Sequence, residues 1–296
     1  MCTSKENAFD EMYQLIRPFH KLHGILVPEF MTADHFDSLA TVQLDASDVW
    51  ISTFPKAGTT WTQQIVKLIR NQGEEDDVQI SKSVPWVENS NYADIDIPSL
   101  PKPRTFKSHM PYELMPCGIP NTTPCKYIYV TRNPKDVAVS LYFHYQRSHA
   151  LPDKKIDWNL FYCNFLNGNV EFGNFLDHVL SWWPHRNDAN VLFLKFEDMK
   201  RDLRAVVARI AHFIGADISD EIVAKVADKS TFKAMKANAA ANYSWSKTDN
   251  PGTTDFMRKG EVGDWENYFT AEQSEEMDKV CREKLQGTGL DYTFKI

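Results

Sequence analysis

The chain has 296 residues, 43% of them hydrophobic and 25% charged, which is the composition of a folded protein with a large core. Its formal net charge of −7 argues against nucleic acid as a main partner. The first residues lack the apolar core of a signal peptide, and no run approaches membrane-spanning length. We therefore expect a cytoplasmic protein with no membrane partner.

The cysteines are few and scattered. There are five of them, an odd number, and none forms a C-x-x-C pair. This usage fits reduced thiols better than a disulfide framework or a zinc site. We expect all of them to be reduced: Cys2, Cys117, Cys125, Cys163 and Cys281.

The first 70 residues contain one strong structural signal. A short helix over 9–16 and a connector over 24–30 come first. An apolar run then ends at Phe54 and passes through a loop into a helical pattern over 61–70. A strand, a small-residue loop and a helix in this order aim backbone N–H groups at an anion. An ordinary strand-to-helix turn is the alternative interpretation of these residues.

The loop itself carries groups suited to an anion. Lys56 supplies a positive charge, and Thr59 and Thr60 supply hydroxyl donors at the mouth of the helix. The usual nucleotide-triphosphatase signature places its lysine directly after the second glycine. Here Lys56 precedes the loop's only glycine, Gly58. The order therefore suggests a phosphate ligand other than that of an ordinary triphosphatase.

The middle of the chain alternates strands with irregular or helical segments. Residues 71–103 are acidic and then proline-rich, as expected of a surface excursion with a short helix. Strands are predicted over 104–109 and 126–131. Asn133 can cap the helix that follows the second strand, which places Arg132 at the strand end in front of a helix.

The last third adds a strand over 190–196 and a helix over 203–214, with Gly215 at its C-terminal cap. Residues 236–257 lack periodicity, and a loop of this length is usually a lid or disordered. A final helix is predicted over 271–285.

This alternation predicts a central parallel sheet flanked by helices, with ligands at the carboxyl ends of its strands. Lys56, His109, Arg132 and Phe196 fall at those ends. The length allows one large domain or two small ones, and no linker divides it, so we expect a single α/β domain over 1–296.

Six blocks, in order, resemble the cytosolic sulfotransferases, a family that uses 3′-phosphoadenosine 5′-phosphosulfate to sulfonate small acceptors. The resemblance spans nearly the whole chain and implies a phosphosulfate-binding loop similar to the phosphate loop of nucleotide kinases. The blocks are F-P-K-A-G-T-T-W (54–61), F-K-S-H (106–109), R-N-P-K-D-V-A-V-S (132–140), F-E-D-M (196–199), S-T-F (230–232) and F-M-R-K-G-E-V-G-D-W (256–265).

The resemblance also implies which residues bind the donor and its product, adenosine 3′,5′-bisphosphate. The 5′-phosphosulfate is expected against Lys56, Ala57, Gly58, Thr59 and Thr60. Adenine is expected against Trp61, Phe196, Ser230 and Phe232. The 3′-phosphate is expected against Arg132, Ser140, Arg258, Lys259 and Gly260, with Phe256 and Met257 completing the donor site.

By the same resemblance, His109 is the general base, and Lys56 and Lys107 act on the transferring group. Preorganised donors can stabilise the charge of an in-line transfer. No carboxylate pair for Mg²⁺ stands out, so no metal is expected. The acceptor, a small aromatic or hydrophobic molecule, is expected against Trp86, Phe143, His144 and Tyr243.

Two other hypotheses remain open at this stage. The chain could be a nucleoside or small-molecule kinase on a related fold, or a catalytically weak ligand-binding homologue. Many relatives carry a dimer segment of the form K-x-x-x-T-V-x-x-x-E, and here Glu266 and Ala271 replace its lysine and valine. Like charges in a self-complementary contact repel, so we expect a monomer or a weak homodimer.

Overall fold

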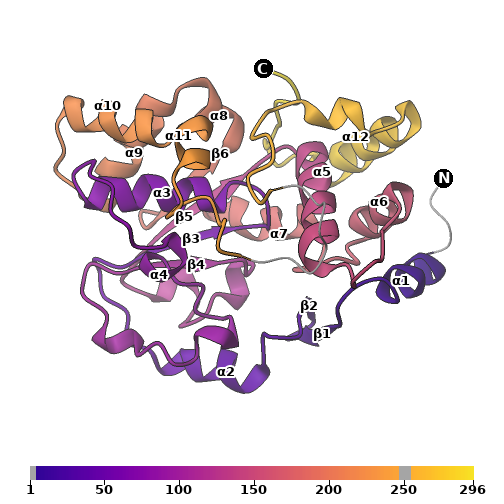
Figure 1. Ribbon diagram of the computed structural model, residues 1–296, viewed down its shortest axis with the longest axis horizontal. Helices are drawn as coiled ribbons and strands as arrows, with labels where there is room; N and C mark the ends of the chain where they lie inside the picture. The colour runs from indigo at the N-terminus through magenta and orange to yellow at the C-terminus, as the bar shows by residue number, and fades with distance from the viewer. Residues whose placement is uncertain (1–4, 247–254) are drawn as a thin grey trace.

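The computed structural model describes residues 5–246 and 255–296. At its centre lies a four-stranded parallel sheet in the order β4-β3-β5-β6 (Figure 1). Trp50 in β3 lies opposite Phe106 in β4 and Tyr127 in β5, which fixes the register. The strands are β3 (Val49–Thr53), β4 (Thr105–Ser108), β5 (Lys126–Thr131) and β6 (Val191–Lys195).

Helices cover both faces of this sheet, because its inner strands are apolar on both sides. Ile51 and Ile128 belong to the buried cluster on the face of α3, α9 and α10. Trp50, Tyr127 and Tyr129 belong to the cluster on the opposite face, with α5, α6 and α7. The helices named so far are α3 (Thr59–Arg70), α5 (Pro134–His144), α6 (Trp158–Asn167), α7 (Phe175–Trp182), α9 (Leu203–Ile214) and α10 (Asp220–Lys229).

The remaining elements lie outside the four-stranded sheet (Figure 1). A two-stranded antiparallel hairpin near the beginning of the chain joins β1 (Phe19–Leu22) to β2 (Ile25–Pro28). The other helices are α1 (Lys5–Tyr13), α2 (Ala33–Ser38), α4 (Ile80–Ser83), α8 (Phe196–Arg201), α11 (Phe232–Ala237) and α12 (Ala271–Leu285).

Most predicted elements are confirmed. The parallel α/β sheet is present, and the helices predicted over 203–214 and 271–285 have those bounds as α9 and α12. Asn133 caps α5, because its side chain accepts a hydrogen bond from the backbone N–H of Asp136 at 2.8 Å. Gly215 ends α9 in the left-handed conformation.

Four expectations differ from the structure. The first helix covers 5–13 rather than 9–16, and the expected connector over 24–30 contributes a strand to the β1–β2 hairpin. Phe196 does not end β6 but begins α8, where it is buried. Cys163 is disulfide-bonded, so the expectation of fully reduced thiols is wrong for this residue. Cys117, Cys125 and Cys281 are free, and Cys2 lies outside the described residues.

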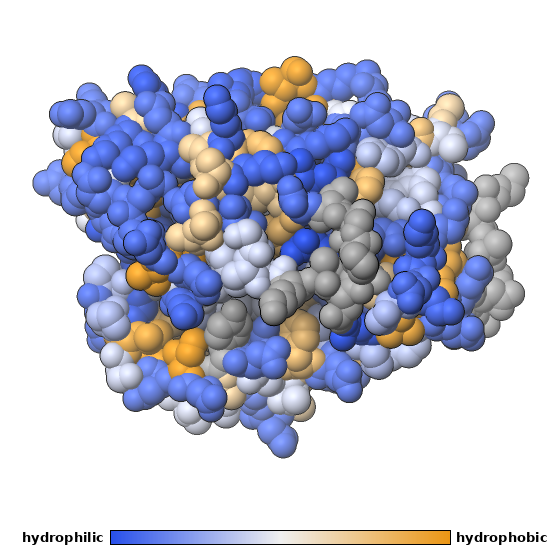
Figure 2. All heavy atoms as spheres, viewed as in Figure 1, coloured by the Kyte–Doolittle hydropathy of each residue, from blue (hydrophilic) through white to orange (hydrophobic). Residues whose placement is uncertain are grey.

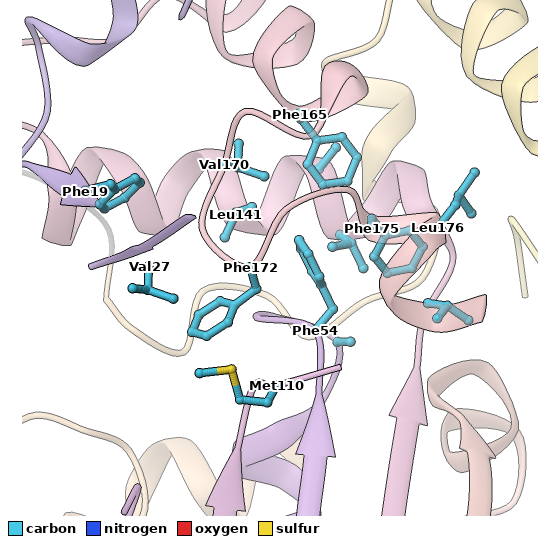
Figure 3. Close-up of a cluster of buried hydrophobic side chains, with 14 of the residues drawn as sticks. Phe19, Val27, Phe54, Met110, Leu141, Phe165, Val170, Phe172, Phe175 and Leu176 are labelled. Carbon is cyan, nitrogen blue, oxygen red and sulfur yellow. The ribbon is translucent and has the colours of Figure 1, made fainter. Parts of the chain in front are cut away.

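Side chains above the carboxyl ends of the strands form a closely packed cluster (Figure 3). Phe54 lies directly after β3 and packs edge-to-face on Phe175 of α7, with ring centroids 5.3 Å apart. Met110, just after β4, is buried in the same cluster. This cluster fixes the loops that follow β3 and β4, and those loops carry the predicted Lys56 and His109.

The surface is mainly polar. Figure 2 shows hydrophilic residues over most of the visible face, with apolar residues scattered among them. No helix within residues 5–246 and 255–296 combines the length and apolar character that crossing a membrane requires.

A buried ion pair joins the amino ends of β3 and β4. Arg104 donates from Nε to Oδ1 of Asp48 at 2.9 Å and from a terminal nitrogen to Oδ2, and both side chains are almost fully buried. Arg104 also donates to the carbonyls of Ile97 and Gln43. The pair therefore ties the long 71–103 excursion to the edge of the sheet.

Substitution of Asp48 should be strongly destabilising. We expect Asp48→Asn to lower the free energy of unfolding by about 3–5 kcal/mol, because it leaves the Arg104 charge buried without a partner. The exposed pair of Asp198 and Arg201 is the matched control, and Asp198→Asn should cost less than about 1 kcal/mol. Urea denaturation measures both, and equal costs would contradict this assignment.

Candidate active site

The loop between β3 and α3 has a strained backbone. Lys56 adopts φ +70°, a left-handed conformation that is uncommon for a residue with a side chain. Gly58 has φ +127°, and a Cβ built there would lie 3.2 Å from the Phe196 ring. The loop thus needs glycine at 58, and strain of this kind is concentrated at functional sites.

The same loop exposes the first turn of α3. Gly58 is the N-cap residue, and no side chain caps the helix. The first N–H groups of a helix have no partner within it and attract anions. The hydroxyls of Thr53 and Thr59 lie 2.6 Å apart, which fixes the start of the helix on the end of β3. The predicted anion-binding geometry is therefore present.

A cavity opens beside this loop, and we call it the Arg132 cavity. It brings together segments from the beginning, middle and end of the chain. Predicted residues that line it are Lys56, Thr60, Trp61, Arg132, Ser140, Phe143, His144, Phe196, Phe232, Phe256, Met257, Arg258, Lys259 and Gly260.

Arg132 is the buried cation of this cavity. Its guanidinium lies 4.4 Å above the Phe196 ring and donates to the carbonyl of Glu261 at 2.6 Å. The Nε atom is buried and has no hydrogen-bond partner among the described residues. Burial lowers the pKa of Arg132 from its usual value, and the charge of Arg258 lowers it further. A bound anion would stabilise the charged guanidinium and so raise the pKa of Arg132 again.

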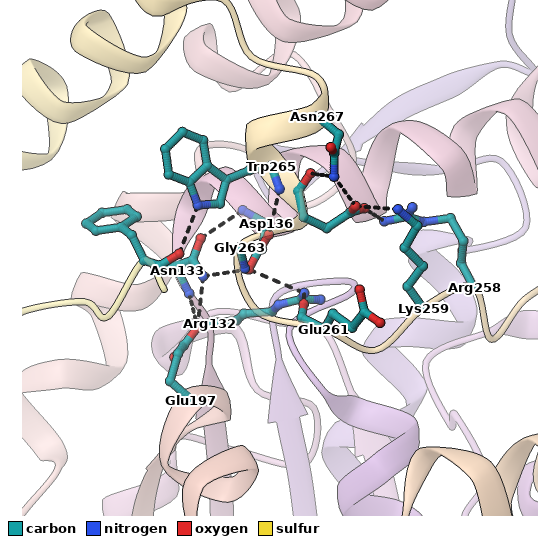
Figure 4. A network of polar contacts seen from close by, with 12 residues as sticks. Arg132, Asn133, Asp136, Glu197, Arg258, Lys259, Glu261, Gly263, Trp265 and Asn267 are labelled. Atoms are coloured by element: carbon teal, nitrogen blue, oxygen red, sulfur yellow. Dashed lines mark hydrogen bonds and ion pairs between the residues drawn. The ribbon is translucent and has the colours of Figure 1, made fainter. Parts of the chain in front are cut away.

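Two carboxylates hold the cations of the cavity in place (Figure 4). Asp264 is buried and bridges Arg258 and Lys259, each at 2.5 Å. Asp136, at the start of α5, accepts the backbone N–H groups of Gly263 at 2.8 Å and Trp265 at 3.1 Å. The 256–265 segment is thus fastened to the helix that follows Arg132.

A second cavity also has Lys56 in its lining, and we call it the His109 cavity. It shares five residues with the Arg132 cavity, so the two are adjacent. The shared residues are Lys56, Thr60, Trp61, His144 and Phe256. The other predicted residues in its lining are Gly58, Thr59, Trp86, Lys107, His109 and Tyr243.

The imidazole of His109 has a defined tautomer. Its Nδ1 lies 2.8 Å from the carbonyl oxygen of Thr53, and a carbonyl can only accept, so Nδ1 carries the proton. Burial, followed by the charge of Lys107, holds the pKa of His109 well below its ordinary value. The ring is therefore neutral near pH 7, and Nε2 keeps its lone pair.

Buried polar groups fix the backbone of His109. Glu88 accepts its N–H at 3.0 Å, and His178 donates from Nε2 to its carbonyl at 2.9 Å. His178 in turn accepts at Nδ1 from the Tyr129 hydroxyl at 2.8 Å. Neither Glu88 nor His178 follows from the sequence blocks, because both reach His109 through tertiary contacts.

The two lysines that line the His109 cavity have lowered pKa values. Burial, with the nearby charge of Lys107, lowers the pKa of Lys56 to about 7. Burial lowers the pKa of Lys107 to about 8. Lys56 lies 4.0 Å above the Phe256 ring and Lys107 lies 4.2 Å above the Trp86 ring. Aromatic faces therefore position both cations.

Three predicted residues lie elsewhere than expected. Ala57 is fully buried and lines neither cavity. Ser230 is also fully buried, and its contribution is a carbonyl that accepts from the Trp61 indole at 2.7 Å. Phe143, expected against the acceptor, lines the Arg132 cavity and lies under Arg258 at 4.5 Å. Part of the expected lid, 247–254, is outside the described residues.

Some lining residues were not anticipated. Glu171, Ser148 and Asn89 line the His109 cavity, and Arg147 and Lys200 line the Arg132 cavity. None belongs to a block that resembles the family. Glu171 precedes Phe172, a non-glycine residue with φ +63°, but that conformation cannot be read from the sequence.

Comparison with known proteins identifies the family. Residues 46–289 match the family described as "Sulfotransferase domain". Sulfotransferase 1C2 of Rattus norvegicus is 35% identical over 274 residues, covering 90% of this chain and 92% of that protein. The amine sulfotransferase of Oryctolagus cuniculus is 37% identical over 271 residues, covering 88% of each.

The chain belongs to the sulfotransferase family. A solved structure of mouse sulfotransferase SULT7A1 complexed with PAP is 33% identical and superposes with a TM-score of 0.75, covering 91% of this chain and 94% of that one. A retinol dehydratase structure in complex with androsterone and inactive cofactor PAP is 25% identical, with a TM-score of 0.83 and coverage of 96% and 95%. The expected family, enzyme class and fold are thereby confirmed.

The perturbed lysine of this sulfotransferase can be tested directly. We expect Lys56 to react with an amine-selective reagent with a titration midpoint near pH 7, because burial and Lys107 disfavour its charged form. Competitive labelling followed by mass spectrometry measures this midpoint. A midpoint near about 10.4, the ordinary value for a lysine, would contradict the assignment.

Proposed function

We propose that this sulfotransferase moves a sulfuryl group from 3′-phosphoadenosine 5′-phosphosulfate to a hydroxyl or amine of a small aromatic or hydrophobic acceptor. The observation that carries the proposal is the pair of adjacent cavities. One is lined by Arg132, Arg258 and Lys259, the other contains a neutral His109, and Lys56 lies in the lining of both. Relatives solved with PAP support the same donor.

The Arg132 cavity suits the donor's separated anions. The 3′-phosphate would bind Arg132, Arg258 and Lys259, which surround it as charge-assisted donors. The 5′-phosphosulfate would bind the uncapped start of α3 and Lys56. Trp61, Phe196 and Phe232 line the space between, where adenine would stack.

His109 is proposed as the general base. Its Nε2 would take the proton of the acceptor hydroxyl while the oxygen attacks sulfur and the sulfur–oxygen bond to the phosphate breaks. The leaving product is adenosine 3′,5′-bisphosphate. Lys56 and Lys107 would stabilise the charge on the transferring group and the departing phosphate. We propose that transfer needs no metal, because these cations and the helix N–H groups supply that stabilisation.

The acceptor would enter the His109 cavity. Trp86, Tyr243 and Phe256 give that cavity aromatic walls, and His144 adds a polar group. Structures named as retinol dehydratase contain androsterone or retinol, which are small hydrophobic alcohols. A hydrophobic acceptor with a reactive hydroxyl or amine fits these walls.

Three further proposals concern the whole chain. We propose that residues 1–296 act as one domain and that the protein is cytoplasmic, as expected from its kinship. We also propose a monomer or weak homodimer, because Glu266 replaces the lysine of the dimer segment and pairs with Lys295 of its own chain. The kinase alternative is weaker, since the loop lacks the usual lysine placement.

Donor specificity tests the proposal. In EDTA, the wild type should bind adenosine 3′,5′-bisphosphate at least about 100-fold more tightly than AMP, because the 3′-phosphate adds several charge-assisted hydrogen bonds. Arg258→Gln should lose about 10-fold or more of the bisphosphate affinity and leave AMP affinity unchanged. Calorimetry measures both ligands. A requirement for Mg²⁺ and ATP would support the kinase alternative instead.

Loss of the base should separate chemistry from binding. We expect His109→Gln to lower transfer by about 100-fold or more and to change bisphosphate affinity less than threefold, roughly, because the base acts on the acceptor. Exposed His212 on α9 is the matched control, and His212→Gln should leave both unchanged. The wild type should keep its activity below pH 6.5, since the pKa of His109 is lowered. Persisting transfer in His109→Gln would show that the base is misassigned.

A further inference from the structure

Two histidines and a glutamate meet beside the His109 cavity, which His144 and Glu171 line. His149 Nε2 lies 3.2 Å from Glu171 Oε2, and His144 Nε2 lies 4.0 Å from Glu171 Oε1. Ligating atoms of the three side chains all lie within 4.8 Å of one another. None of them takes part in the proton transfer or the charge stabilisation proposed above, although His144 lines the proposed acceptor cavity.

A local change in helix geometry brings the two imidazoles together. α5 continues as a π-helical turn over Tyr145–His149, closed by a hydrogen bond from Ala150 N–H to the Tyr145 carbonyl at 2.7 Å. Residues five apart in an α-helix point about 140° away from each other. The π turn instead places His144 and His149 with ring centroids 5.1 Å apart. Such turns are frequent at functional sites.

Backbone hydrogen bonds hold Glu171 in place beside the histidines. Its backbone N–H donates to the Tyr145 hydroxyl at 2.9 Å, so the π turn also fixes the glutamate. The next residue, Phe172, has φ +63°, and its N–H donates to the carbonyl of Leu26 at 2.7 Å. A left-handed conformation is energetically unfavourable for phenylalanine. The backbone directly after Glu171 is therefore held in an uncommon conformation next to the imidazoles.

The cluster contains a buried polar atom without a partner. His149 and Glu171 are only 6% and 3% exposed. Nδ1 of His144 is buried and has no hydrogen-bond partner among residues 5–246 and 255–296, while the buried Nε2 of His149 faces the Glu171 carboxylate at 3.2 Å without a well-aligned hydrogen bond. Buried polar atoms in folded proteins are normally satisfied, and each exception calls for an explanation.

We propose that His144, His149 and Glu171 form a Zn²⁺ site. Two imidazoles and one carboxylate, with a fourth position left open, are a donor set that zinc uses in proteins. Bonds of about 2.0–2.2 Å would place the ligand atoms about 3.4 Å apart. The His149–Glu171 distance is already compatible, and the side chain of His144, 20% exposed, has room to close the remainder.

The fourth position of this ion faces open space. His144 and Glu171 line the His109 cavity, and all three ligands line another cavity beside Phe30. Lys56 and Lys107 share the His109 cavity, and their pKa values of about 7 and about 8 limit the positive charge that opposes a dication in mildly alkaline solution. Water or an oxygen or nitrogen atom of a bound molecule could therefore complete the coordination.

The test uses the full chain, freed of metal with EDTA, exchanged into buffer at pH 8 and titrated with ZnCl₂. We expect one equivalent of zinc per chain and a rise in melting temperature on binding. Glu171→Gln and His149→Gln should each weaken zinc binding by more than about 100-fold, because even outer partners of a metal site contribute 10- to 100-fold. Co²⁺ should give the absorption spectrum of a low-coordinate site.

Matched variants make the outcome decisive. His23 forms an exposed pair with Asp37 at 2.8 Å, so His23→Gln should leave zinc binding unchanged. His144→Phe replaces the most exposed of the three ligands. It provides the test of zinc binding if the variants of the buried His149 and Glu171 do not fold. Absence of binding at 100-fold excess zinc would show that the cluster is only an ion pair. Binding retained in Glu171→Gln and His144→Phe would place the zinc elsewhere. Either result overturns the proposal, and neither bears on sulfuryl transfer.

Discussion

The site depends on one carboxylate, that of Asp136, which joins parts of the chain that are far apart in sequence. It accepts N–H groups from Gly263 and Trp265 and the side-chain amide of Asn133, and it lies 3.6 Å from Arg132 (Figure 4). Cations repel one another, so a cluster of them forms only where anions or hydrogen bonds hold the backbone. Asp136 accepts these hydrogen bonds from its position in the first turn of α5, which begins beside Arg132.

Carboxylates also hold the other groups around the Arg132 cavity. Asp264 pairs with both Arg258 and Lys259, while Glu197 accepts the N–H of Asn133 at 2.8 Å. Arg132 contacts Asp136 at 3.6 Å, a carbonyl and an aromatic face, and its Nε has no hydrogen-bond partner among the described residues. The cations are thus preorganised without being fully satisfied. An anion entering between them would gain charge-assisted contacts without the cost of gathering the cations.

How far the sequence predicted this site can be judged residue by residue. Lys56, His109 and Arg132 could be placed because each follows an apolar strand, and parallel strands bring their carboxyl ends to one edge. Local signals also predicted the caps at Asn133 and Gly215. What could not be predicted depends on tertiary contacts. Glu88 and His178 reach His109 only after folding, and no local pattern marks them.

Phe256 is one of the side chains that the two cavities share. Phe256 lines both, lies under the Lys56 ammonium, and stacks on Tyr243 with ring centroids 4.4 Å apart. Phe256 also directly precedes the 257–260 segment that lines the Arg132 cavity. Through these contacts, Phe256 joins Tyr243 in the wall of the His109 cavity to the segment that carries Arg258 in the wall of the Arg132 cavity.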